Sequence, residues 1–114
     1  MSGFEDVASV SQLPEGEMLG VKLSDGTPVC VFNHKGTIGA VGNLCTHAEF
    51  YISDGVMHKD GTLECMWHGA RFDCRTGAAK RFPAQVPLPV YAVEIEGERV
   101  RVASTPPASA GSST

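Results

Sequence analysis

Cys45-Thr46-His47 and Cys65-Met66-Trp67-His68 are the two stretches that decide how this chain folds. Seventeen residues separate them, so the full pattern is C-x-H-x17-C-x-x-H. Each stretch contributes one thiol and one imidazole. Mixed pairs of this kind suit an iron–sulfur centre in which two histidines replace two cysteines on one iron.

The local geometry expected of these stretches lets their polar side chains converge. In an extended segment, residues i and i+2 point the same way, so Cys45 and His47 can both face inward. Gly42 and Gly69 flank the motif and allow the backbone to bend tightly beside it. The predicted metal ligands are one thiol and one imidazole from each of two loops: Cys45, His47, Cys65 and His68.

A structural zinc site is the alternative that ligand composition leaves open, because two cysteines and two histidines suit zinc equally well. Common zinc sites pair cysteine with cysteine and histidine with histidine, so the mixed pairs favour an iron–sulfur centre. His34 and His58 fall in predicted turns away from the motif, and we expect both to be exposed turn residues. Cys30 and Cys74 remain, and we expect them to be free thiols in a reducing compartment.

Length, composition and charge describe one small domain. The chain has 114 residues, of which 42% are hydrophobic, and a formal net charge of −4. A negative charge argues against nucleic acid and anionic membranes as partners. Residues 1–10 have neither an apolar core nor an Arg-Arg pair, and no run is long enough to span a bilayer. We therefore expect a cytoplasmic protein.

Short segments of alternating polarity, separated by turns that contain glycine, predict an all-β fold, an antiparallel sandwich or barrel. The predicted strands are 4–10, 18–23, 29–33, 37–42, 52–57, 62–65, 90–95 and 99–102. Residues 12–17 form a single helical turn at most. Residues 104–114 contain only Ser, Thr, Pro, Ala and Gly, so we expect a disordered tail.

The motif continues as Gly69-Ala70-Arg71-Phe72-Asp73, and in this form it resembles Rieske proteins. The resemblance runs from about Phe4 to Ala103. Small size makes the chain most similar to the Rieske-type [2Fe–2S] ferredoxin of bacterial aromatic-ring-hydroxylating dioxygenase systems. The resemblance implies a Rieske fold over residues 1–103, with a cluster-binding subdomain at about 43–83 that consists of the two ligand loops.

The same resemblance implies one [2Fe–2S] cluster, with Cys45 and Cys65 on one iron and His47 and His68 on the outer iron. It also implies a monomeric electron carrier with no catalytic residues of its own. In that family a ferredoxin reductase takes electrons from NAD(P)H, and the ferredoxin passes them singly to a terminal oxygenase. The small subunit of assimilatory nitrite reductase also resembles a Rieske domain, and a subunit of that kind is the second functional hypothesis.

Departures from the respiratory Rieske pattern indicate the low-potential branch of the family. Respiratory members carry a disulfide between the cluster loops, where this chain has Phe50 and Trp67. They also carry Ser and Tyr hydroxyls that donate to the cluster, where this chain has Ala70 and Phe72. Trp67 is expected to pack over the cluster or to meet a partner. Pro83 either belongs to a loop that covers the cluster or is a plain turn residue.

Overall fold

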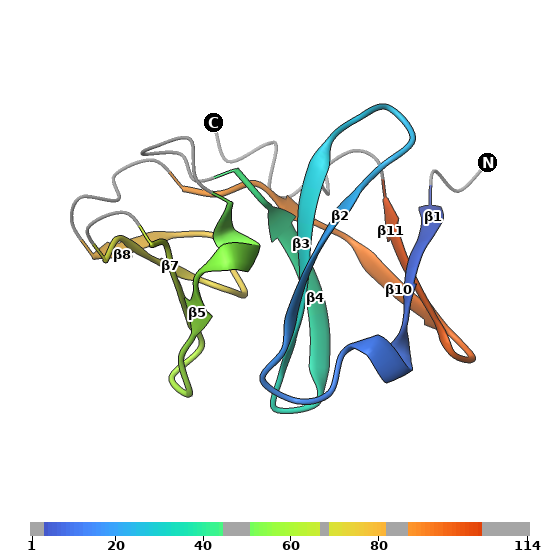
Figure 1. Cartoon of the computed structure of the whole chain (residues 1–114), viewed down its shortest axis with the longest axis horizontal. Helices are drawn as coiled ribbons and strands as arrows, with labels where there is room; N and C mark the ends of the chain where they lie inside the picture. The colour runs from blue at the N-terminus through green and yellow to red at the C-terminus, as the bar shows by residue number, and fades with distance from the viewer. Residues whose placement is uncertain (1–3, 45–50, 67–68, 82–86, 104–114) are drawn as a thin grey trace.

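The computed structural model describes residues 4–44, 51–66, 69–81 and 87–103. Within these ranges eleven strands form three antiparallel sheets, with two short 3-10 helices between them (Figure 1). The strands are β1 Phe4–Ser9, β2 Met18–Lys22, β3 Pro28–His34, β4 Thr37–Gly42, β5 Val56–Met57, β6 Thr62–Glu64, β7 Arg71–Asp73, β8 Ala79–Arg81, β9 Val90–Tyr91, β10 Val93–Glu96 and β11 Arg99–Ala103. The 3-10 helices are η1 Val10–Gln12 and η2 Ile52–Asp54.

The central sheet has the order β2-β3-β4-β9, and β3 is buried on both of its faces. Successive side chains of a strand point to opposite faces of the sheet. Val29 and Val31 therefore pack into one apolar core, while Cys30 and Phe32 pack into another. This double burial explains why β3 is a nearly continuous apolar run.

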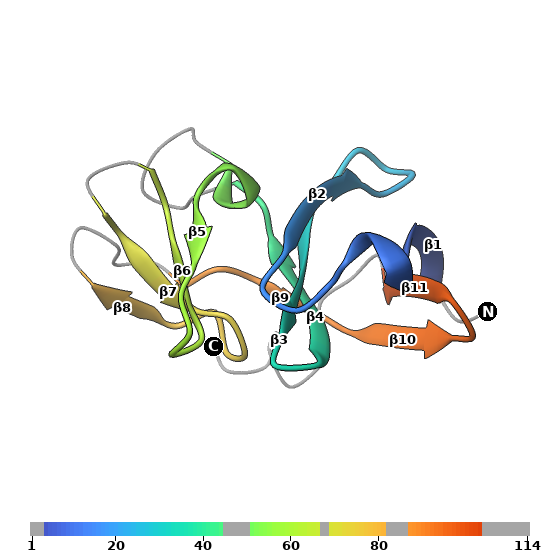
Figure 2. The same ribbon diagram turned by 60° about the horizontal axis from the view of Figure 1, so that its bottom comes forward.

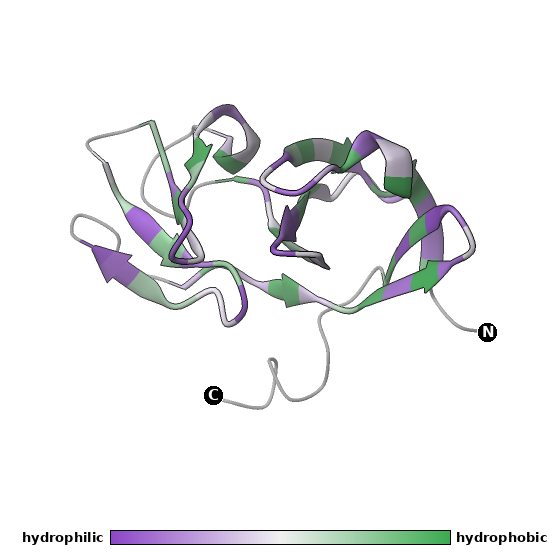
Figure 3. Cartoon of the chain, turned by 90° about the horizontal axis from the view of Figure 1, so that it is seen from below, coloured by the Kyte–Doolittle hydropathy of each residue, from purple (hydrophilic) through white to green (hydrophobic). Residues whose placement is uncertain are grey.

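The first core lies between the central sheet and a second sheet of order β1-β11-β10. Its buried residues are Leu13, Leu23, Val29, Val31, Ala40, Val100 and Val102. Figure 3 shows β10 and β11 banded by alternating hydropathy, as expected for strands with one covered face. We call these two sheets together the base half.

The third sheet, of order β5-β6-β7-β8, lies on the opposite side of the central sheet (Figures 1 and 2). We call it, with the two segments that carry the predicted ligands, the loop half. Its strands are only two or three residues long. The second core joins it to the central sheet through Cys30, Phe32, Val41, Ile52, Leu63, Cys65, Ala70, Phe72, Cys74 and Leu88.

The all-β prediction is confirmed, and so are most strands of the base half. Residues 24–27 contain an Asp-Gly pair, which is typical of hairpin turns, and they place Gly26 at φ 90°, with its N–H donating to Leu23 C=O over 2.9 Å. The last hairpin also forms as expected, between β10 and β11. No helix among the described residues is long and apolar enough to cross a membrane.

Three local predictions are wrong. Residues 52–57 begin with η2 and are extended only at β5, because Ser53 N–H donates to the Asn43 side chain over 2.8 Å instead of to a strand. The predicted strand 90–95 is divided between two sheets, as β9 and β10. The single helical turn is η1, which begins at Val10 and not at Gln12. Strands β7 and β8 were not predicted, and residues 104–114 lie outside the described residues.

Candidate metal centre

The first predicted ligand loop leaves the central sheet after β4 and is closed at its base. Leu44 pairs with Tyr51 in an isolated antiparallel bridge. Next to it, Ile52 N–H donates to Asn43 C=O over 2.6 Å. These contacts bring the two ends of segment 45–50 together.

The second predicted ligand loop connects β6 to β7. It is closed by a hydrogen bond of 2.8 Å from Cys65 N–H to Ala70 C=O. Gly69 has φ +73°, a conformation that L side chains rarely adopt, so the tight bend predicted there is confirmed. Gly42 differs, because it lies in β4 and is needed where the Pro89 ring closely approaches its backbone.

The backbone of the two loop bases is in contact. A side chain at Gly55, just beyond the first loop, would collide with Glu64 C=O, which directly precedes Cys65. The Cys65 side chain is fully buried, while its neighbour Met66 is 64% exposed. If Cys65 binds a metal cluster as a thiolate, the bound iron supplies the positive charge that compensates for burying it. The described part of the second loop is compatible with such a cluster.

Of the four predicted ligands, only Cys65 belongs to the described residues. Cys45, His47 and His68 lie outside them, and so do Phe50, Trp67 and Pro83. Within the described ranges no group of three or more His, Cys, Asp or Glu side chains is placed to hold a metal ion. The complete ligand set therefore remains a prediction.

The two remaining cysteines are buried free thiols, as predicted. Cys30 is fully buried in β3, and burial raises the pKa of its thiol to about 12. Burial also raises the pKa of Cys74, which follows β7. Thiols that stay protonated in this way are unreactive members of the core.

A charged network beside the second loop was not predicted. His58 was expected to be an exposed turn residue, but its side chain is only 30% exposed and its Nε2 lies 2.6 Å from Glu64 Oε1. The hydrogen bond from His58 lowers the pKa of Glu64, and Arg71 opposite it on β7 acts in the same direction. Arg71 Nη2 is 3.6 Å from Glu64 Oε1, and its Nη1 is 4.0 Å from Asp60 Oδ2. Neither spacing nor periodicity in the sequence indicated this network.

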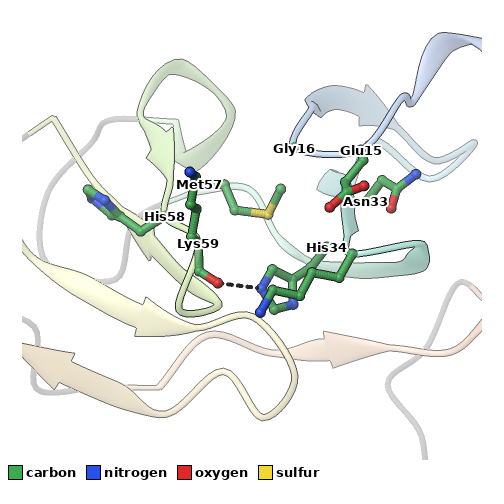
Figure 4. Close-up of a pocket in the computed structure, with 8 residues that line it drawn as sticks. Glu15, Gly16, Asn33, His34, Met57, His58 and Lys59 are labelled. Carbon is green, nitrogen blue, oxygen red and sulfur yellow. Dashed lines mark hydrogen bonds between the residues drawn. The ribbon is translucent and has the colours of Figure 1, made fainter.

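His34 is also half-buried rather than exposed, and it joins the two halves of the molecule. Its Nε2–H donates to Lys59 C=O over 3.1 Å, from the end of β3 to the turn before β6 (Figure 4). A pocket of about 160 Å³ lies beside this hydrogen bond. Its lining residues are Glu15, Gly16, Asn33, His34, Lys35, Met57, His58 and Lys59. None belongs to a predicted ligand loop, so the pocket is separate from the metal centre.

Comparison with known proteins identifies the family. Residues 4–92 match the model of the Rieske [2Fe–2S] domain. The chain is 37% identical over 97 residues to the ferredoxin component of the naphthalene 1,2-dioxygenase system of Pseudomonas aeruginosa, covering 85% of this chain and 91% of that protein. It is 39% identical over 97 residues to the ferredoxin component of biphenyl 2,3-dioxygenase of Rhodococcus jostii, covering 84% and 88%.

Solved structures agree with the sequence relatives. A chain in the complex of reduced oxygenase and oxidised ferredoxin of carbazole 1,9a-dioxygenase superposes with a TM-score of 0.87 at 27% identity, covering 94% of this chain and 98% of that one. A chain described as an NADH-dependent nitrite reductase small subunit from Mycobacterium tuberculosis gives a TM-score of 0.76 at 24% identity, with coverages of 87% and 92%. The second likeness shows the fold alone.

The chain belongs to the Rieske [2Fe–2S] domain family, as the match over residues 4–92 shows. Within that family it is a ferredoxin with one Rieske-type cluster, an electron carrier and not itself an enzyme.

Proposed function

We propose that this protein carries single electrons from an NAD(P)H-dependent ferredoxin reductase to the terminal oxygenase of an aromatic-ring dioxygenase system. The observation that carries the proposal is the closure of both predicted ligand loops, with the buried Cys65 in the second and exposed apolar residues around them. The ferredoxin components to which the chain is similar support the same assignment.

The proposed ligands are the two thiols Cys45 and Cys65 and the two imidazoles His47 and His68. With two thiolates and two neutral imidazoles, a bound [2Fe–2S] centre accepts and releases one electron at a higher potential than an all-cysteine centre. The hydrogen bond between Cys65 and Ala70 closes the base of the second loop, and the close approach of Gly55 to Glu64 brings the base of the first loop beside it. The cluster-binding subdomain is accordingly proposed to cover about residues 43–83.

The proposed docking surface surrounds the ligand loops. Leu44, Tyr51 and Met66 are large apolar residues with 47%, 45% and 64% exposure, and they lie at the ends of segments 45–50 and 67–68. Isolated apolar residues are common on protein surfaces, but three beside one site favour an interface. An electron carrier must release one partner before it meets the next, so we expect a small, transient contact by a monomer in the cytoplasm.

Reconstitution tests the proposed function. The purified protein should contain two irons and two inorganic sulfides, show a Rieske spectrum, and support oxygenase turnover when a reductase and an oxygenase are supplied. Replacing His47 or His68 should bleach that spectrum or change its g-values. Stoichiometric zinc without visible absorption would contradict the proposal. Stable co-purification with one large reductase would favour the nitrite reductase subunit instead.

Surface variants test the docking surface. Met66→Ser and Trp67→Ala should slow electron delivery to the oxygenase while the cluster stays assembled. Ile95→Ser is the matched control, because Ile95 is 47% exposed but lies on β10 in the base half. Stopped-flow reduction of the oxygenase measures the rate. Unchanged rates with both partners in Met66→Ser and Trp67→Ala would place the docking surface elsewhere.

A further inference from the structure

The carboxylate of Glu64 lies directly against the second ligand loop. Glu64 precedes Cys65 in the chain, and its Oε2 is 3.2 Å from the position that a Cβ would take at Gly69. Gly69 follows His68, so the carboxylate is placed against the backbone that returns from the proposed histidine ligand. The Glu64 side chain is 30% exposed, which places its charge at the protein–solvent boundary and not in bulk water.

Two basic side chains hold this carboxylate in position. An ionised carboxylate only accepts hydrogen bonds, so His58 carries a proton on Nε2 and donates it over 2.6 Å to Oε1. Arg71 reaches the same oxygen from β7, with Nη2 at 3.6 Å. One oxygen is thereby held by His58 and Arg71, and the other faces the loop.

The positive charge of Arg71 is shared between two carboxylates. Besides Glu64, the Arg71 guanidinium approaches Asp60, with 4.0 Å between Nη1 and Oδ2. Asp60 lies in the turn between β5 and β6, at the far end of the hairpin from Cys65. Of the charges in the network, the Glu64 carboxylate is thus the one in contact with the ligand loop.

We propose that Glu64 sets the reduction potential of the cluster, acting as a fixed negative charge that His58 and Arg71 hold against the second ligand loop. Reduction adds one negative charge to the centre, and a like charge nearby opposes it. Because the network is partly buried, salt screens this repulsion less than it would screen a surface charge. The inference rests on the proposed function, since it requires Cys65 and His68 to be ligands.

Four variants and spectroelectrochemical titration of the loaded protein test the proposal. Glu64→Gln keeps the shape and removes the charge, so it should increase the reduction equilibrium constant at least about threefold, or ~28 mV for a one-electron couple. Glu64→Asp keeps the charge and should give less than half of that shift. Arg71→Gln removes the compensating positive charge and should move the potential in the opposite direction.

Glu94→Gln is the matched control. Glu94 is paired with Arg101 at 3.1 Å in the base half, so its replacement removes a similar ion pair far from the loops and should leave the potential unchanged. The titration reports only loaded molecules, so partial loss of cluster does not disguise the result. If Glu64→Gln does not bind the cluster, Arg71→Gln still tests the inference. An unchanged or raised reduction potential in Arg71→Gln would overturn it.

The outcomes separate this inference from the proposed function. A wild-type protein without a Rieske spectrum overturns both. A wild-type Rieske spectrum with an unchanged or lowered potential in Glu64→Gln overturns the inference alone. An equal shift in Glu64→Asp and Glu64→Gln would also overturn it, because side-chain geometry and not charge would then set the potential.

Discussion

The two halves of the molecule are stabilised in different ways. In the base half, every strand except the two-residue β9 has four to seven residues, and the longest register is the six pairs between β3 and β4. In the loop half, the strands have two or three residues, and β5 and β6 share only two pairs. Ladders that short add little stability by themselves. The loop half therefore depends on its packing against β3 and, we expect, on the metal that ties its loops together.

The charged networks of the two halves differ in how far their carboxylates are exposed to solvent. On the base half, Arg101 is 26% exposed, but the carboxylates that it pairs with, Asp6, Glu94 and Glu96, are 46–68% exposed. On the loop half, Arg71 is 25% exposed, Asp60 is 62% exposed, and the carboxylate of Glu64 is only 30% exposed. Exposed pairs contribute little to stability because solvent screens them. The least exposed of these carboxylates is the one positioned to act on the site.

Loss of the cluster should have the largest effect, and it should be confined to one half. We expect Cys65→Ser to abolish the Rieske spectrum and lower Tm by ~10 °C or more, because metal binding contributes to folding. Hydrogen exchange in this variant should accelerate at the backbone amides of residues 65 and 74 but stay slow across β3 and β4. Cys74→Ala is the control and should keep its cluster. Equal protection of both halves without metal would contradict the comparison.

Substitutions that create a cavity should lower the free energy of unfolding to a different extent in the two cores once the metal is removed. Leu63 is fully buried in the loop half and Val31 in the base half. Leu63→Ala should lower the free energy of unfolding by ~2–5 kcal/mol in the loaded protein and by much less in the metal-free protein. Val31→Ala should lower the free energy of unfolding by ~2 kcal/mol in both the loaded and the metal-free protein, because the core around Val31 does not depend on the cluster. Denaturant unfolding of the four samples measures this, and a full Leu63→Ala cost without metal would show that the loop half folds alone.

Hydroxyl groups introduced beside the loops should raise the reduction potential. We expect the wild-type value near about −150 mV, at the low end of the Rieske range. Ala70 and Phe72 are fully buried next to the second loop. Ala70→Ser and Phe72→Tyr should each raise the potential by roughly tens of millivolts, since a donated hydrogen bond favours the more negative, reduced state. Protein-film voltammetry measures the shift, with Ala40→Ser in the base half as the control. A downward shift would contradict this account.

Lowering the pH should have the smallest effect on stability, because it removes only the weak stabilisation that two ionised carboxylates provide. Asp60 and Asp25 lie in turns of the loop half and the base half, and hydrogen bonds from Thr62 and Thr27 lower the pKa of each carboxyl below its ordinary value of 3.8. A lowered pKa stabilises the fold above pH 3.8, and this stabilisation is lost as the pH falls through the folded-state value.

Asp25→Asn and Asp60→Asn should therefore be slightly less stable than wild type at pH 7, and the difference should be smaller at pH 3. Thermal unfolding at both pH values measures the difference. Removal of the metal should erase the effect of Asp60→Asn and preserve that of Asp25→Asn. A difference between wild type and Asp25→Asn that grows toward pH 3 would reverse the sign of this argument.

Local signals explain which parts of the fold could be predicted. Asp25-Gly26 specifies its own turn, and the alternation from Met18 to Leu23 specifies which face of β2 is buried, so these features followed from neighbouring residues. Strands β7 and β8 have three residues each, too few for a periodic signal. The error at 52–57 has a different cause, since η2 is held by Asn43, a residue distant in sequence.

Ligand spacing and turn chemistry are local, so the sequence by itself determined the four candidate ligands, the Rieske resemblance and the all-β class. Only the tertiary structure decided what lies around the site. Glu64, His58 and Arg71 come from three different segments, and their contact depends on the register of β6 against β7 and on the turn that precedes β6. Strands of three residues carry too short a hydrophobic pattern to specify that register in advance, so it was visible only once the loop half had packed on the central sheet.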